Sequence, residues 1–485
     1  MRKTVGGLLI AVVFVLGFAA PSYALPQDQK AAIQSLVDEA SRVSGVPGIS
    51  VSVIKDNQVS YFSSGYANQE ESVPASENTL YELASVSKSL TGVGILLLAE
   101  QGRLSMNDSI DKYLPWFTLR YRGTPVDMSR LTLNHFLHHT SGLTNTMHFM
   151  LIPQGDSPDM LRKTVEAFVD ANVAFPPGNH YEYGTMNYDI LGLVIEVVSG
   201  QSYEAFMANS VFEPLGMNHT YVFKDDAVET GNMAQGYRSI FLSTKPYDAP
   251  DFAGNKPAGY IISSAADMAR WMAVQLGEVE GLPGTLEAAI TKSHAADTSV
   301  EPIYGMYYAA GWFVNPEKTL IQHGGDNPNF TTNVVLYPEE KVGIALLSNG
   351  ANTNGDLALA IKEIVDGNMV QSYRMSSLQV LDLSLSATTV AMTLLAGFFI
   401  VLGARRMKKN ERQPLTKEKM ITIGLWGLVT VTSCVLLGVF PSFFGFNWAV
   451  APIWLPPTNF SAVGSVVLVA ASITWFVATP GKART

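Results

Sequence analysis

The hydrophobic pattern predicts two β-hairpins, one near each end of the polar part of the chain. Residues 48–54 alternate as a half-buried strand does, and Asp56-Asn57 predicts a turn into a second strand over 59–65. A second hairpin is predicted over 332–337 and 342–348. We therefore expect an antiparallel sheet built from the two ends of this segment.

Between the hairpins, apolar residues recur mainly at helical spacing. Together with the hairpins they predict an α+β fold, in which an antiparallel sheet is flanked by helices and a helical subdomain occupies the middle of the chain. The main predicted helices cover residues 27–43, 85–103, 133–138, 190–198 and 356–372.

The N-terminus has the pattern of a signal peptide. Arg2 and Lys3 precede an apolar run over 5–20, and Ser22-Tyr23-Ala24 is a small-x-small cleavage pattern. A retained anchor helix is the alternative, but the run is shorter than the roughly 20 residues that a span needs. We predict that residues 1–24 are removed and that the mature chain begins at Leu25.

Three apolar runs near the C-terminus predict three transmembrane helices, over about 385–403, 420–440 and 460–477. The loop 404–419 between the first two is rich in Lys and Arg, which places it in the cytoplasm. The preceding residues then lie outside, in agreement with the signal peptide. The other loop would carry an outer aromatic belt, formed by Phe443, Phe444, Phe446, Trp448 and Trp454.

These signals divide the chain into a signal peptide (1–24), an extracytoplasmic domain (25–376) and a membrane domain (377–485). The predicted location is the inner membrane of a bacterial cell, with several passes. The 485-residue chain has a formal net charge of −10, and its acidic excess lies before residue 384, which argues against nucleic acid as a partner. The partner that we expect instead is membrane lipid, which would contact the three predicted spans.

No metal or cofactor is predicted. The only cysteine, Cys434, lies inside an apolar run and forms neither a disulfide framework nor a thiolate site. His135, His138 and His139 resemble a metal cluster, but no carboxylate partner stands near them. Core packing and turn capping account for these histidines more simply.

Ser85 and Lys88 form the first candidate chemical group. They lie three residues apart at the start of a predicted buried helix, so their side chains share a face. A serine hydroxyl becomes a useful nucleophile when a neighbouring group accepts its proton, and desolvation can make a lysine neutral enough to do so. Free N–H groups at a helix start could also stabilise a developing oxyanion. A plain helix with a solvated lysine is the alternative.

Two later segments could complete a site with these residues. Tyr183 lies in a loop before the helix 190–198, from which it could reach a cleft. Further on, His323-Gly324-Gly325 stands at a strand end, where glycine permits close approach of the backbone to a ligand.

The order S-x-x-K, Y-x-N, H/K-x-G resembles that of penicillin-binding proteins and class C β-lactamases, from about Ile49 to Asn349. The resemblance implies that Ser85 attacks an acyl carbon while Lys88 and Tyr183 manage its proton. It leaves open which of the two is the base. It also implies an oxyanion hole formed by the backbone N–H groups of Ser85 and Asp326.

One residue departs from this pattern, because Thr185 stands where the family usually has an asparagine that holds the substrate's amide. This departure weakens the assignment of a β-lactam or a D-Ala-D-Ala peptide as the substrate. Asn187 could compensate, but its position two residues later points it elsewhere.

A narrower resemblance accounts for both the departure and the C-terminal spans. The chain is similar to membrane-bound peptidases that mature nonribosomal peptide prodrugs, of the colibactin-maturation and zwittermicin type. This implies hydrolysis of the amide after an N-acyl-D-asparagine cap of a small acylated peptide, which releases an active metabolite, with a prodrug exporter as a possible partner. The implied substrate-binding residues are Thr185, His323, Gly325, Asn327 and Asn329.

Several alternatives stay open at this stage. His323 could instead serve the strand end, and Asn327 and Asn329 could form the turn around Pro328. The enzyme could also be a D-alanyl-D-alanine carboxypeptidase, a β-lactamase or a D-amino esterase. A membrane receptor that acylates slowly is disfavoured, because no cytoplasmic output module is present in the sequence.

Overall fold

The computed structural model describes residues 25–145, 157–241, 243–250, 252–351, 356–370, 372–375, 377–408, 417–439, 442, 448, 450–454 and 457–479. The predicted signal peptide lies outside these residues, as do residues 409–416 of the basic loop 404–419 and three of the five belt aromatics.

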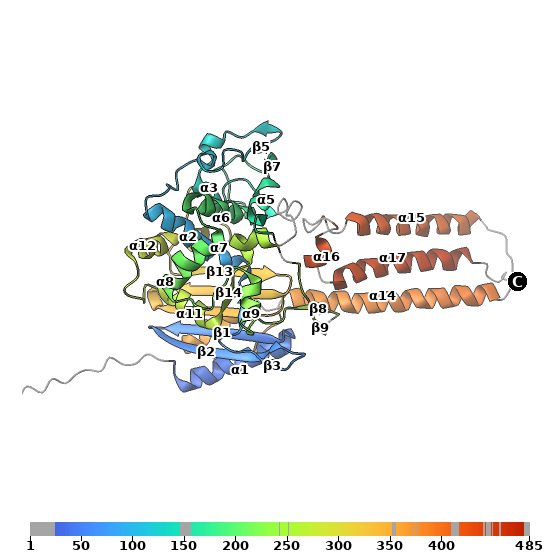
Figure 1. Cartoon of the computed structure of the whole chain (residues 1–485). Coiled ribbons are helices and arrows are strands. Elements are labelled where there is room, and N and C mark those ends of the chain that lie inside the picture. The colour runs from blue at the N-terminus through green and yellow to red at the C-terminus, as the bar shows by residue number, and fades with distance from the viewer. Residues whose placement is uncertain are drawn as a thin grey trace, which may run out of the picture.

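An eight-stranded antiparallel sheet forms the centre of the N-terminal part, with the order β11-β12-β13-β14-β15-β1-β2-β3 (Figure 1). The first and last hairpins meet in it, since Ile49 of β1 pairs with Ser348 of β15. This confirms the predicted α+β architecture and its sheet built from chain ends. The strands are β1 Gly48–Lys55, β2 Gln58–Asn68, β3 Val73–Pro74, β11 Tyr307–Tyr308, β12 Phe313–Val314, β13 Ile321–Asn327, β14 Phe330–Tyr337 and β15 Val342–Ser348.

The turn between β1 and β2 has the backbone that its sequence predicts. Asp56 and Asn57 have φ values of 47° and 62°, the left-handed pair found in two-residue hairpin turns. The strand itself differs from the prediction, because β1 is buried on both faces rather than one. Helices cover both sides of it, and Ser50 Oγ satisfies its buried hydroxyl by donating to Ser76 O at 2.8 Å.

The outer face of the sheet is covered by α1 (Gln27–Ser44) and α13 (Asp356–Val365). Their apolar stripes, including Ile33 and Ile361, pack on β1 and β15 residues such as Val51. The helix α13 ends at Val365, earlier than the predicted residue 372. Gly367 takes a φ of 85° and Asn368 N–H donates to Glu363 O, which is a Schellman ending.

The other face carries the larger core and the helical subdomain, in which α2 (Ser87–Glu100) is the central and almost fully buried helix. The remaining helices here are α3 Leu133–Leu137, α5 Met160–Glu166, α6 Met186–Ser199, α7 Tyr203–Met207, α8 Glu213–Leu215, α9 Lys224–Glu229, α10 Lys256–Gly259, α11 Ala265–Gln275 and α12 Gly284–Ser293. Short strand sets join them: β4 Leu80–Glu82 with β10 Ile262–Ser264, β5 Leu119–Tyr121 with β6 Thr124–Pro125 and β7 Ala171–Val173, and β8 Tyr237–Ile240 with β9 Ser243–Pro246.

The C-terminal part consists of three long helices that run side by side away from the sheet, with a short helix at their near end (Figure 1). Two stretches, Gln379–Arg406 and Pro457–Val477, are long and apolar enough to cross a membrane, whereas the apolar stretch of the third, Met420–Val435, is shorter. The prediction of three spans therefore stays a proposal. The helices are α14 Ser377–Lys408, α15 Lys417–Val439, α16 Ala451–Trp454 and α17 Pro457–Ala478.

Candidate active site

Ser85 lies in a tight turn between β4 and α2. The α-helix begins at Ser87, and Ser85 precedes it in a 3-10 turn, η1 (Ala84–Val86). Ala84 has a φ of 46°, a left-handed backbone that costs energy for a residue with a Cβ. Such strain concentrates at functional sites, where the surrounding structure holds it in place.

Lys88 reaches back from the first turn of α2 to this serine. Its Nζ donates to Ser85 Oγ at 3.1 Å and to Ala258 O at 2.6 Å. The side chain is completely buried. Burial lowers the pKa of Lys88 to about 7, against the opposing influence of the Asp189 carboxylate, so a neutral amine is accessible near neutral pH.

Asp189 and Asn255 form the support behind Lys88. Asp189 is completely buried on α6, and this burial raises the pKa of its carboxyl well above the usual value, while Lys88 lowers it. With its amide oriented toward this carboxylate, Asn255 Nδ2 donates to both oxygens, at 2.8 and 3.0 Å. The sequence reading assigned neither residue a role, although a carboxylate within an apolar helix is itself a signal.

Tyr183 enters the site from the loop before α6. Lys88 Nζ lies 5.1 Å from the centre of its ring. Burial raises the pKa of Tyr183, and its interaction with the Ser85 hydroxyl lowers it by a smaller amount. The phenol is thus protonated at neutral pH.

The loop that carries Tyr183 is held by His139, whose ring centre lies 4.4 Å from that of Tyr183. His139 Nδ1 accepts from Gly184 N–H at 3.3 Å and from Asn187 Nδ2 at 2.8 Å. Asn187 also accepts from Ser141 Oγ at 2.5 Å and is completely buried. Asn187 therefore holds the loop and does not point into the cleft.

Strand β13 closes over the nucleophile at Gly325. A Cβ on this glycine would lie 2.6 Å from Leu83 O and 2.8 Å from Ser85 N, so only glycine permits this approach. The carboxyl of the next residue, Asp326, accepts from Thr331 Oγ1 at 3.3 Å. The segments proposed to supply the two oxyanion donors are thus in direct contact.

His323 is buried beside the cleft as a neutral imidazole. Its Nδ1–H donates to Gly324 O at 2.6 Å, so Nε2 accepts from Tyr308 O–H at 3.1 Å. Burial lowers the pKa of His323 to about 3. His323 lines the cleft, but it lies inside β13, where it pairs with Val334, and not at a strand end as the sequence predicted.

These groups surround one cavity of about 440 Å³, called the Ser85 cleft below. Six residues singled out from the sequence line it, and Gly325 lies just behind them. Five further side chains line it that the sequence did not single out for a site, namely Asn145, Asn255, Ala258, Phe313 and Trp454. The complete lining is Ser85, Asn145, Tyr183, Thr185, Asn255, Ala258, Gly259, Phe313, His323, Gly324, Asp326, Asn327 and Trp454.

Thr185 lies in the wall of the Ser85 cleft at the N-terminus of α6. Its N–H donates to Asn145 Oδ1 at 2.9 Å, and Asn145 N–H donates to Tyr183 O at 3.2 Å. Asn145 thereby supplies a carboxamide beside Thr185, the position at which the family usually has an asparagine. Neither periodicity nor a motif in the sequence marked this residue.

The two later asparagines differ in position. Asn327 lines the Ser85 cleft, but its Nδ2 donates to Glu82 Oε2 at 2.6 Å and to Gly259 O at 3.0 Å. Asn329 lies instead in a separate cavity of about 230 Å³, where its Nδ2 donates to Tyr247 O at 3.1 Å. The structure therefore does not bring Asn329 to Ser85.

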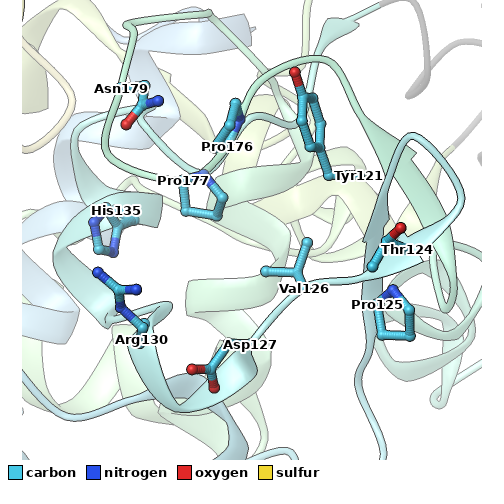
Figure 2. Close-up of a pocket in the computed structure, with 10 residues that line it drawn as sticks. All are labelled: Tyr121, Thr124, Pro125, Val126, Asp127, Arg130, His135, Pro176, Pro177 and Asn179. Carbon is cyan, nitrogen blue, oxygen red and sulfur yellow. The ribbon is translucent and has the colours of Figure 1, made fainter.

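A larger cavity, of about 510 Å³, opens in the helical subdomain and shares no lining residue with the Ser85 cleft (Figure 2). His135 lies at its edge and caps α3, since its Nδ1 accepts from Thr132 N–H at 2.9 Å. His138 contacts Tyr308 O at 3.0 Å. Among the described residues, no group of three His, Cys, Asp or Glu side chains is placed to hold a metal ion.

Comparison with known proteins places the chain in a family. The beta-lactamase family model matches residues 33–368. Protein flp of Staphylococcus aureus (strain MRSA252) is 30% identical over 454 residues, which cover 89% of this chain and 87% of that protein. Penicillin-binding protein 4* of Bacillus subtilis (strain 168) is 29% identical over 308 residues, 60% of this chain and 65% of that one.

A solved structure agrees with these matches. The octameric penicillin-binding protein homologue from Pyrococcus abyssi has a TM-score of 0.61 and 28% identity, and covers 70% of this chain and 78% of its own. The chain belongs to the β-lactamase and penicillin-binding-protein family of serine hydrolases.

Proposed function

We propose that this protein is a membrane-held serine peptidase that forms an acyl-enzyme on Ser85. The observation that carries the proposal is the buried Lys88 amine, 3.1 Å from Ser85 Oγ and with a pKa lowered to about 7. A base of this kind can accept the serine proton at neutral pH.

The reaction proceeds in two steps. Ser85 Oγ loses its proton to the neutral Lys88 amine, either directly or through the Tyr183 hydroxyl, which passes its own proton to Lys88 as it accepts that of Ser85. The oxygen bonds to the substrate's carbonyl carbon, while the backbone N–H groups of Ser85 and Asp326 stabilise the oxyanion. The C–N bond then breaks, and the leaving amine takes up the transferred proton. Water attacks the carbonyl carbon of the resulting ester and loses a proton to the same base. The bond from this carbon to Ser85 Oγ then breaks, the base returns the proton to Ser85 Oγ, and the free acid leaves.

The proposed substrate is a nonribosomal peptide or polyketide prodrug with an N-acyl-D-asparagine cap, cleaved after that residue. The narrower family resemblance suggests it, and Thr185 and Asn145 support it. These two residues bring a hydroxyl and a carboxamide to one wall of the Ser85 cleft. Together they offer donors and acceptors to a substrate carboxamide. The proposed site is the extracytoplasmic face of a bacterial inner membrane, beside a prodrug exporter.

A second candidate function is cleavage of D-Ala-D-Ala peptides or β-lactams. The printed names of Penicillin-binding protein 4* and of the Pyrococcus abyssi homologue favour it. The arrangement of Ser85, Lys88 and Tyr183 serves this chemistry equally well. The two candidates differ in what binds near Thr185.

Substrate preference distinguishes them. We expect an N-acyl-D-Asn amide to be cleaved at least about 10²-fold faster than its L-Asn, D-Leu and D-Ala-D-Ala equivalents, because a buried polar pocket rejects ligands that leave it unsatisfied. Thr185→Val should erode this preference more than it slows hydrolysis of an activated ester. Equal rates on D-Asn and D-Ala-D-Ala substrates, or efficient cephalosporin turnover, would favour the second candidate.

A further inference from the structure

One residue of the Ser85 cleft comes from the C-terminal helices. All other lining residues lie between Ser85 and Asn327, whereas Trp454 ends α16, in the segment between α15 and α17. Figure 1 shows α16 where the near ends of these helices meet the sheet domain. The cleft is therefore assembled from two parts of the chain that are distant in sequence.

The catalytic part of the chain holds this short helix in place. Arg238 Nη1 donates to Pro452 O at 3.1 Å, and the guanidinium lies 4.4 Å from the centre of the Tyr247 ring. Ala451 is completely buried.

The segment is fixed on its other side as well. Thr458 Oγ1, at the start of α17, donates to Asp382 Oδ1 of α14 at 2.6 Å, and both side chains are buried. The helix α14 is in turn tied to the sheet domain, because Gln379 Nε2 donates to Val43 O at 2.9 Å. The segment that carries Trp454 is thus attached on one side at Pro452 and on the other at Thr458.

The indole of Trp454 combines an apolar ring with one polar N–H group. The ring offers contact area to methylene groups, and the N–H can face the aqueous side of a membrane interface. The polar part of a substrate can be bound in the same cleft by Asn145 and Thr185. A substrate with a polar head and an aliphatic chain would satisfy both.

We propose that Trp454 forms a subsite for the aliphatic acyl chain of the substrate, so that the C-terminal helices determine chain-length specificity. This rests on the proposed serine hydrolase activity, and not on the identity of the residue after which the enzyme cuts. An acyl chain leaving the outer lipid layer would enter the Ser85 cleft along α16. Trp454 is a specificity residue here and takes no part in proton transfer.

The test uses the full chain in detergent micelles and a series of 4-nitrophenyl esters with acetyl, hexanoyl and dodecanoyl groups. For the unaltered enzyme, kcat/KM should rise with chain length. Trp454→Ala should lower kcat/KM for the dodecanoyl ester about tenfold or more, mainly through KM, and leave the acetyl ester within about twofold, since only the long chain loses its contact. Trp454→Phe should restore most of the preference.

Trp448→Ala is the matched control. Trp448 is half exposed, stacks on Phe460 with ring centres 5.6 Å apart, and does not line the cleft. It should behave as the unaltered enzyme, which also controls for partition of long esters into micelles. Equal loss of all three esters in Trp454→Ala, or no loss of any, would overturn the subsite.

A separate measurement distinguishes failure of the proposed subsite from failure of the proposed serine hydrolase activity. A fluorophosphonate probe should label Ser85 in the unaltered enzyme and in Trp454→Ala alike. Absence of labelling and of ester turnover in the unaltered enzyme would contradict the serine hydrolase. Normal labelling with no chain-length preference would contradict only the subsite.

Discussion

Lys88 Nζ lies 3.1 Å from Ser85 Oγ and is shielded completely from solvent. A lysine on a surface would keep a pKa near 10 and hold its proton at neutral pH. Here burial lowers the pKa to about 7, which makes the amine a competent proton acceptor. The distance and the burial act together, because either one alone would leave Ser85 a weak nucleophile.

The first prediction is a pH profile set by Lys88. Only the neutral amine accepts a proton, so kcat/KM should rise as the pH increases through about 7 and then level off. The Asp189 carboxylate raises the pKa of Lys88, so Asp189→Asn should move this rise to lower pH. Asp267→Asn is the control, since Asp267 is a buried carboxyl that neither shifts the pKa of Lys88 nor lines the Ser85 cleft. A rise that stays in place in Asp189→Asn would contradict a charged Asp189.

Tyr183→Phe tests the division of proton transfer. The substitution keeps the ring beside His139 and removes only the hydroxyl that interacts with Ser85. Steady-state kinetics should show a loss of about 10²-fold in kcat, the usual range for an acid–base group. A loss of less than about threefold would assign the base role to Lys88 alone.

Gly325→Ala tests the close approach of β13 to the nucleophile. The added Cβ would meet Leu83 O and Ser85 N at 2.6 and 2.8 Å, so we expect a cost of about 1–3 kcal/mol and a marked fall in kcat. Thermal unfolding and ester hydrolysis measure both. Gly324→Ala is the matched control, because its Cβ would find Asn333 Nδ2 at 3.4 Å, an ordinary contact. Equal stability of the two variants would count against this packing.

The membrane orientation is tested by cysteine labelling in a Cys434→Ser background. Lys417→Cys lies at the start of α15, and Ser243→Cys lies on the exposed strand β9 of the sheet domain. An impermeant maleimide should label Ser243→Cys in intact spheroplasts and Lys417→Cys only after permeabilisation. Labelling of Lys417→Cys from outside would reverse the proposed topology.

The sheet and the reacting groups could be predicted because their sequence signals are local. Alternation and the Asp56-Asn57 turn marked the hairpin, and the spacing of Ser85 and Lys88 marked the shared face. The sequence predicts a half-buried β1, because its pattern does not show that α1 and α13 cover one face while α11 packs on the other.

The rest of the cleft could not be predicted from local patterns. Asn145 and Asn255 reach it from segments without a recognisable motif, and Trp454 comes from beyond the catalytic part. Their roles depend on tertiary contacts such as Arg238 with Pro452, which no periodicity encodes. Asn329 shows the converse, since a position two residues after Asn327 in the same motif faces a different cavity.

Trapping the acyl-enzyme tests the central claim most directly. The enzyme is mixed with an N-acyl-D-Asn 4-nitrophenyl ester, quenched in acid within the first turnover, and mapped by peptide mass spectrometry. The acyl group should be found on Ser85, should be absent from Ser85→Ala, and should persist in Ser89→Ala, where a nearby buried serine is removed. An adduct on another residue, or near-normal hydrolysis by Ser85→Ala, would contradict the account.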